Sequence, residues 1–151
     1  MRIVLASDHA GFKLKKEIIN FLASRGIEHQ DVGCDSEERA DYVDFGMKAM
    51  GRLTSGEFDR AVLVCGTGMG MAVVANKYRG VRATTCTDEY MAEMSRGHND
   101  SNCLTLGGRI LPPDEAQHIV RVWLETEFEG GRHRERLEKI EALENRNFKP
   151  V

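Results

Sequence analysis

The sequence contains no long apolar run, which limits the kind of protein it can encode. No stretch approaches the roughly 18 apolar residues of a membrane-spanning helix, so we expect no membrane span and no membrane partner. The first residues, MRIVLASDHAG, reach an acidic side chain before an apolar segment of signal-peptide length has formed. We therefore expect a cytoplasmic protein.

Basic residues are not in excess, and paired cysteine motifs are absent. The chain has 21 lysines and arginines against 24 aspartates and glutamates, and no basic run stands clear of acids. We do not expect it to bind nucleic acid, which requires concentrated positive charge. The four cysteines form no CxxC pair, so we expect reduced thiols and no metal site. They are Cys34, Cys65, Cys86 and Cys103.

What the chain has instead is a regular alternation of short apolar runs with longer helical patterns. Strands are predicted at 3–7, 28–32, 61–65, 82–86 and 102–106, and helices at 11–25, 42–54, 69–78, 88–97, 113–127 and 132–146. This alternation predicts an α/β fold in one domain, residues 1–151. The expected form is a three-layer α/β/α sandwich, Rossmann-like, around a five-stranded, mainly parallel sheet. The last helix and tail, residues 132–151, are expected to pack at a subunit interface.

Four places in the sequence stand at the predicted carboxyl ends of strands, where ligands of open parallel sheets bind. They are Asp8-His9, the segment CGTGMGM that begins at Cys65, Cys86–Asp88 and Gly107–Arg109. Helix capping alone could explain Asp8. A histidine beside it at the same crevice favours an acid–base or ligand-binding pair.

The segment CGTGMGM places three glycines between a strand and a helix, at Gly66, Gly68 and Gly70. Glycines at such a position let main-chain N–H groups approach a bound anion. The segment is not a Walker A loop, because Met-Ala-Val follows the last glycine in place of Lys-Ser/Thr. Its GxGxG spacing also differs from the GxGxxG of dinucleotide-binding loops. A plain tight turn and an anion-binding loop both remain compatible with it.

Cys65 stands at the mouth of this loop. A buried cysteine is commonly a small apolar side chain, whereas the start of a helix stabilises a thiolate. The same N–H groups could stabilise an oxyanion that forms beside the sulfur, and Thr67 adds a hydroxyl. Cys65 could therefore be a nucleophile or a proton-abstracting base. The CxxxxxR loop of thiol phosphatases is absent, because Met71 occupies the arginine position.

Two polar segments lie outside these crevice positions. SRGHNDSN places His98 and Asn99 before the last predicted strand, at the amino end of the sheet and away from the crevice of the same chain. A catalytic His98 would then serve a neighbouring subunit, which predicts an obligate oligomer with shared sites. EGGRHRERLEKI places Arg132 and Arg136 four apart on one helix face. They form either a phosphate clamp or a solvated charged surface.

The chain resembles the ribose-5-phosphate isomerase B family, which is related to the galactose-6-phosphate and allose-6-phosphate isomerases. Five segments occur in the family's order and spacing: SDHAGFKLK, CGTGMGM with ANK, SRGHNDSN, LGGRI and EGGRHRERLEKI. The resemblance covers nearly the whole chain. It implies an aldose–ketose isomerase that acts on a phosphorylated sugar without a metal or organic cofactor. It also implies a homodimer or tetramer with active sites shared across the interface.

The resemblance further implies a role for each matching residue. Cys65 would be the base that moves a proton between carbons 1 and 2, while Thr67 and the loop amides stabilise the enediolate. His98 would assist ring opening as an acid, with Asp8 orienting the sugar hydroxyls. The residues implied in substrate binding are Asp8, His9, Gly66, Thr67, Gly68, Met69, Gly70, Asn99, Arg109, Arg132 and Arg136. Among them, the phosphate would be held by His9, Arg132 and Arg136.

Two positions locate the chain within this family and leave its sugar open. A second branch of the family carries a glutamate base where this chain has Met71, so the chain resembles the cysteine branch. The usual DYP reads Asp41-Tyr42-Val43 here, and loss of the proline is expected to loosen a loop beside the site. Ribose 5-phosphate is the leading substrate, with galactose, allose or erythrose/erythrulose phosphates as alternatives. A non-catalytic phosphate- or FMN-binding module of flavodoxin-like shape is the alternative from another class.

Overall fold

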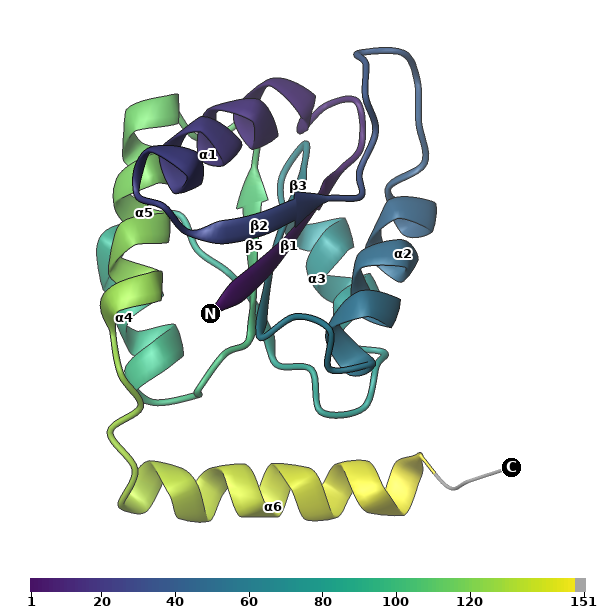
Figure 1. The fold of residues 1–151 in the computed structure, drawn as a ribbon. Coiled ribbons are helices and arrows are strands. Elements are labelled where there is room, and N and C mark those ends of the chain that lie inside the picture. The colour runs from purple at the N-terminus through teal and green to yellow at the C-terminus, as the bar shows by residue number, and fades with distance from the viewer. Residues whose placement is uncertain (149–151) are drawn as a thin grey trace.

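A computed structural model describes residues 1–148 of the chain, as five strands and six helices (Figure 1). The strands are β1 (Arg2–Ser7), β2 (Glu28–Asp31), β3 (Arg60–Cys65), β4 (Ala83–Thr85) and β5 (Cys103–Gly107). The helices are α1 (Phe12–Ser24), α2 (Tyr42–Thr54), α3 (Met69–Ala75), α4 (Glu89–Gly97), α5 (Pro113–Glu125) and α6 (Arg132–Asn147). Every predicted element is present. Residues 149–151, the end of the predicted interface tail, lie outside the described residues.

The predicted helix over 69–78 is three residues too long, because Asn76 leaves α3 to bond a strand. Its Nδ2 donates to the carbonyl of Ala83 at 2.9 Å, and the N–H of Ala83 donates to Asn76 Oδ1 at 2.9 Å. This reciprocal pair joins the end of α3 to the first residue of β4. A cross-element contact of this kind has no counterpart in helical periodicity.

The sheet is parallel throughout, with the strand order β2-β1-β3-β5-β4. The chain runs from β1 outward to β2 and then crosses back to add β3 on the other side of β1. The topological switch point therefore lies between β1 and β3, and ligands of such sheets bind beyond the carboxyl ends of strands at this point. Asp8 follows β1 and Cys65 ends β3, so the fold brings these two predicted site residues to one crevice.

Two apolar layers cover the sheet, and the strands supply them with alternate side chains. In β1, Ile3 and Leu5 join one layer while Val4 and Ala6 join the other. Helices α1, α4 and α5 cover the first face, and α2 and α3 cover the second (Figure 1). The predicted three-layer α/β/α sandwich is confirmed. Cys65 belongs to the layer that α2 and α3 cover.

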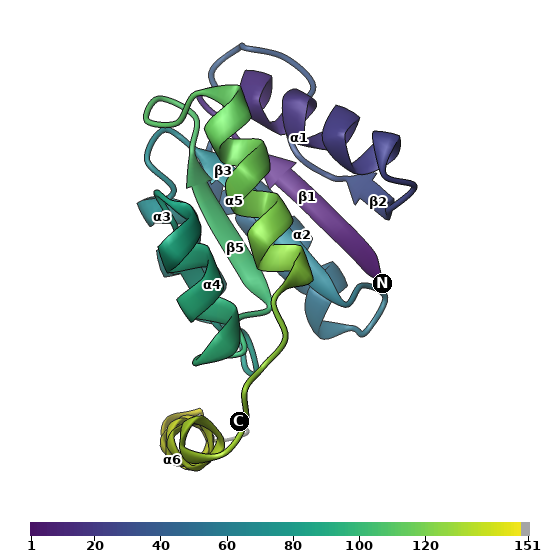
Figure 2. The ribbon, with the colours of Figure 1, turned by 90° about the vertical axis from the view of Figure 1, so that its left-hand side faces the viewer.

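Helix α6 belongs to neither layer. Figures 1 and 2 show it beyond the sandwich, near the end of the sheet at which β5 begins. His133 is its buried residue, whereas Ile140 and Leu143 are about half exposed. Apolar side chains on a helix set apart from the body favour a partner surface. No helix within residues 1–148 combines the length and apolar character needed to cross a membrane.

Candidate active site

The glycine loop after β3 aims a main-chain donor at the Cys65 sulfur. The N–H of Gly68 donates to Sγ at 3.2 Å, and Cys65 is 5% exposed. Gly68 has φ 82°, and a Cβ there would lie 3.0–3.1 Å from backbone atoms of Leu106. Glycine is therefore required at this position, both for its backbone angle and for the close approach of β5. The loop is a preorganised turn around a thiol.

Arg109 and Thr67 lie against the same loop. The N–H of Arg109 donates to the carbonyl of Gly66 at 3.1 Å, and the Arg109 guanidinium reaches to 3.7 Å from where a Cβ on Gly66 would stand. Thr67 is exposed, and its Oγ1 accepts from the N–H of Met69 at 3.4 Å. A cation and a hydroxyl thus stand at the solvent side of the thiol.

Asp8 is placed beside this loop by the pairing of β1 with β3. Its N–H donates to the carbonyl of Val64 at 3.3 Å, and its buried carboxylate accepts from the N–H of Gly11 at 3.0 Å. The residue that precedes the first turn of α1 is Gly11, so Asp8 closes the turn before the helix and is not the helix cap considered from the sequence. The other carboxylate oxygen offers an acceptor for a ligand hydroxyl.

His9 is oriented by the segment that precedes α2. Its Nδ1 lies 3.1 Å from the carbonyl and 3.2 Å from the N–H of Ala40, so this nitrogen is engaged in either tautomer. The other ring nitrogen, Nε2, is the one that can meet a ligand. An open cavity of about 440 Å³ adjoins these groups and is lined by Asp8, His9, Arg39, Ala40, Asp41 and Tyr42.

His98 lies in a different environment, at the end of α4. Its imidazole stacks on His133 of α6, with ring centroids 4.0 Å apart and planes within 9°. Glu129 places one carboxylate oxygen 3.8 Å from His98 Nε2 and the other 3.5 Å from His133 Nε2. The N–H of Glu129 also donates to the carbonyl of Gly97 at 3.0 Å. The start of α6 is thereby joined to the end of α4.

The predicted site residues therefore form two groups at opposite ends of the sheet. Cys65 is in register with Gly107, the last residue of β5, whereas His98 precedes the first residue of that strand. Figure 2 shows α6 beyond the amino end of β5. The first group is Asp8, His9, Gly66, Thr67, Gly68, Met69, Gly70, Cys65 and Arg109. The second is His98 with Asn99, Arg132 and Arg136, the last three exposed.

His98, Glu129 and His133 also offer three potential metal ligands, whose ligand atoms lie within 4.8 Å of one another. An imidazole binds a metal through a lone pair in the plane of its ring. Two parallel rings stacked face to face cannot aim both lone pairs at one ion. The geometry of these three residues therefore does not suit a metal centre. It favours a stacked pair in which His133 orients His98.

Comparison with known proteins identifies the family. The model of the ribose/galactose isomerase family matches residues 3–140. The chain belongs to this family. Ribose-5-phosphate isomerase B of Escherichia coli K12 is 43% identical, over 96% of this chain and 97% of that protein. The solved structure of Clostridium thermocellum ribose-5-phosphate isomerase B is 49% identical, with a TM-score of 0.94 over 97% of this chain and 99% of that one. D-erythrulose-4-phosphate isomerase of Pectobacterium atrosepticum is 36% identical over 96% of each protein.

Membership of the ribose/galactose isomerase family means that the chain is a sugar-phosphate isomerase. Burial raises the pKa of the Cys86 and Cys103 thiols. Those two cysteines are therefore poor sources of a thiolate. Cys65 differs from them in receiving a backbone N–H at sulfur. Among these three thiols, the geometry favours Cys65 for chemistry.

Val43, which stands where the family usually has proline, is part of a helix cap in this isomerase. Its N–H donates to Asp41 Oδ1 at 2.9 Å, at the start of α2. Proline has no N–H and could not make this bond. The hydrogen bond fastens the turn that a proline would have stiffened. The sequence predicted that loss of the proline would loosen this loop. The hydrogen bond from Val43, which a proline could not make, opposes that loosening.

Three side chains near the crevice were given no role from the sequence, which placed Tyr42 only in a loop beside the site. Tyr42 covers the glycine loop so closely that a Cβ on Gly70 would lie 2.8 Å from its ring, and Arg39 lines the cavity with it. Lys15 is fully buried, where it pairs with Asp31 at 2.8 Å. The DYV segment pointed to the loop that carries Tyr42, and the break in the helical pattern before α2 could have pointed to Arg39. The lysine resembles any other in an amphipathic helix.

The buried His133 predicts a pH-dependent stability. Burial lowers its pKa, and the neighbouring charges of His98 and Arg132 lower it further. The unfolded chain, with a histidine pKa of about 6.5, therefore binds this proton more readily than the folded protein, so stability is full above that pH and falls below it. We expect Tm to fall more steeply on acidification from about pH 7.5 to 5.5 in the wild type than in His133→Phe, which keeps a ring for stacking. An equal fall of Tm with pH in the two proteins would contradict this prediction.

Proposed function

We propose that this isomerase interconverts D-ribose 5-phosphate and D-ribulose 5-phosphate by moving one proton between carbons 1 and 2. The observation that carries the proposal is the hydrogen bond from the Gly68 N–H to the Cys65 sulfur at the switch point of the sheet. It joins the Cys65 thiol, the proposed base, to a loop whose N–H groups can meet a developing oxyanion. Proton transfer beside a carbonyl requires both.

Cys65 is the base in this proposal. As a thiolate it takes the proton from carbon 2 of the open-chain aldose, and the carbonyl oxygen on carbon 1 gains the negative charge of the enediolate. The loop amides and the Thr67 hydroxyl stabilise that charge. Cys65 then returns the proton to carbon 1 while the hydroxyl proton of oxygen 2 passes to oxygen 1. The product is the 2-ketose, and no redox partner is consumed.

Ring opening and phosphate binding draw on both groups of residues. Ribose 5-phosphate is mainly a furanose, so its ring oxygen must gain a proton as the hydroxyl on carbon 1 loses one. His98 of a second subunit supplies the acid, and Asp8 orients the hydroxyls. The phosphate is held by His9 with Arg132 and Arg136, and Asn99 and Arg109 contact the substrate. A phosphate bound far from the reacting carbons fixes their position.

A homodimer, or a tetramer built from it, is part of the proposal. The two groups of site residues lie at opposite ends of one sheet, so a complete site needs a second copy. Helix α6 carries the arginines and exposes apolar side chains, which favours its packing on that copy. We also place the protein in the cytoplasm, which suits its four buried, unpaired cysteines.

A substrate screen tests the proposal. A four-carbon sugar phosphate is the second candidate, because the Pectobacterium relative is named for one. We expect kcat/KM for D-ribose 5-phosphate to exceed that for D-erythrose 4-phosphate, D-allose 6-phosphate and D-galactose 6-phosphate by about tenfold or more. The Cys65→Ala protein, purified in the same way, controls for contaminating isomerases. A higher kcat/KM for another sugar phosphate would assign that sugar as the substrate. Absence of turnover with all of the sugar phosphates would reject the function. A yellow protein that binds FMN tightly would favour the flavodoxin-like alternative.

A further inference from the structure

Asp100 has a backbone conformation that L-residues rarely adopt, two positions after His98. Its φ is 44°, and it is the one non-glycine residue with positive φ in the described part of the chain. Aspartate tolerates the left-handed region better than most residues, but the conformation still carries a cost. Strain of this kind persists where surrounding contacts hold the backbone in place.

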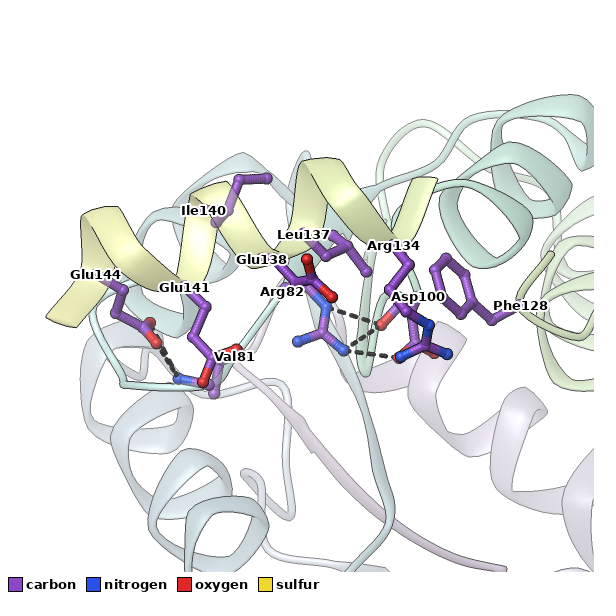
Figure 3. Close-up of a pocket in the computed structure, with 11 residues that line it drawn as sticks. Val81, Arg82, Asp100, Phe128, Arg134, Leu137, Glu138, Ile140, Glu141 and Glu144 are labelled. Atoms are coloured by element: carbon purple, nitrogen blue, oxygen red, sulfur yellow. Dashed lines mark hydrogen bonds and ion pairs between the residues drawn. The ribbon is translucent and has the colours of Figure 1, made fainter. Parts of the chain in front are cut away.

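Two arginines hold the Asp100 carboxylate. Arg96 Nη1 donates to Oδ1 at 2.8 Å, and Arg82 Nη2 donates to Oδ2 at 2.9 Å. Figure 3 shows Arg82 pointing to Asp100 in the groove beneath α6. Both contacts are charge-assisted and short, the type of hydrogen bond that fixes geometry most strongly.

The same arginines also bind the main chain on either side of this carboxylate. Arg82 Nε lies 3.0 Å from the carbonyl oxygens of both Asn99 and Asp100, and its Nη2 donates to the latter at 2.8 Å. Arg96 Nη1 donates to the carbonyl of Ser101 at 2.6 Å. Every carbonyl from Asn99 to Ser101 therefore accepts from a guanidinium. This set of contacts is called the Asp100 clamp below.

Breaking the Asp100 clamp costs free energy, because Arg96 is buried. Its side chain is 7% exposed, and its Nε has no hydrogen-bond partner among the described residues. Loss of the carboxylate would leave a buried guanidinium without the ion pair that compensates it. The clamp is also anchored to α5, since Trp123 Nε1 donates to Ser101 Oγ at 2.7 Å. The clamp therefore restrains the backbone of the residues that directly follow His98.

We propose that Asp100 is a positioning residue for ring opening. Held by Arg82 and Arg96, it fixes the backbone after His98 and so directs the imidazole toward the sugar bound at the site of a second subunit. His133 and Glu129 hold the ring of His98, and the Asp100 clamp holds the main chain of the residues that follow it. The inference rests on the proposed function, in which His98 is the ring-opening acid.

The test compares a ring substrate with an open-chain one. Ribose 5-phosphate closes to a furanose, whereas ribulose 5-phosphate cannot, because the hydroxyl needed for that ring carries the phosphate. A defect limited to ring opening therefore slows the aldose direction more than the ketose direction, which can release an open-chain aldose. We expect Asp100→Ala to lower kcat with ribose 5-phosphate by about tenfold or more and kcat with ribulose 5-phosphate by about threefold or less.

Asp100→Asn is the conservative variant, since asparagine also tolerates positive φ and keeps one acceptor oxygen. It should recover part of the lost aldose rate, and it carries the test if Asp100→Ala fails to fold by circular dichroism. Glu138→Gln removes another carboxylate from the same groove and should leave both rates near wild type. His98→Asn is the reference for a pure ring-opening defect.

The outcomes separate this inference from the proposed function. The direction-dependent loss in both His98→Asn and Asp100→Ala, with partial recovery in Asp100→Asn, supports the inference. In a second outcome, His98→Asn shows the direction-dependent loss, but the Asp100 variants keep both kcat values or lose both equally. The positioning role is then overturned and the isomerase function stands. Equal loss of both directions in His98→Asn overturns the ring-opening role and this inference together. A wild type that turns over no phosphosugar rejects the proposed function itself.

Discussion

Replacement of Cys65 by alanine is expected to lower kcat by about 10³-fold or more, because it removes the group that carries the proton in the proposed mechanism. Binding of the sugar phosphate should stay within about threefold of wild type, since the proposal assigns the phosphate to other residues. Steady-state kinetics and calorimetry with a substrate analogue measure the two effects separately. Exchange of solvent deuterium into the sugar should be lost in parallel with turnover.

Two matched variants sharpen this result. Cys65→Ser keeps the size of the side chain and an acceptor for the Gly68 N–H, but its hydroxyl does not ionise near neutral pH, so it should be nearly as inactive as alanine. Cys86→Ala removes a buried thiol whose pKa is raised, and should keep its turnover. Near-normal activity of Cys65→Ala would rule out the cysteine as the base.

Mixing two variants that are each impaired toward ribose 5-phosphate is expected to restore activity toward that substrate. If each site takes Cys65 from one subunit and His98 from the other, a dimer of one Cys65→Ala and one His98→Asn subunit has one complete site. Random 1:1 assortment makes half of the dimers mixed, each with one of two sites intact, so recovery approaches about 25% of wild type. The opposite placement of the two residues on one sheet is the structural reason.

Two affinity tags can separate the mixed dimers after joint refolding or co-expression. A mixture of Cys65→Ala with Cys65→Ser damages the same half of every site and should recover nothing. Mixed dimers that are isolated but remain as inactive as their parents would contradict shared sites. The experiment therefore tests the oligomer and the division of the site at once.

The elements of the fold follow closely from the sequence because their signals are local. The alternating residues of β1 mark both faces of the sheet, and the apolar positions of α1 at Leu14, Ile18 and Leu22 mark one side of a helix. Errors arose where a contact between elements ended an element, as Asn76 does for α3. Sequence also located Asp8 and Cys65 at one crevice, because both stand at the carboxyl ends of strands in a parallel sheet.

The features of the candidate site also divide into those with local sequence signals and those that depend on contacts between elements. The glycine spacing and the cysteine before it predicted a loop of main-chain donors at a thiol, and the position of His98 before β5 predicted that one chain would be insufficient. Helical spacing placed Arg132 and Arg136 on one helix. The histidine stack, the cover of Tyr42 on Gly70 and the burial of Lys15 could not be predicted in this way. Each of these depends on which surfaces meet.

The sequence by itself determined the class of fold, the crevice and the chemical groups available there, because periodicity and turn chemistry act between residues close in the chain. Only the tertiary structure decided how those groups are held. The Asp100 clamp joins the loop after α4 to Arg82 before β4, and the His98 stack joins α4 to α6. Such contacts arise from packing between distant segments, where a charge or a ring gains its partner only once the chain has folded.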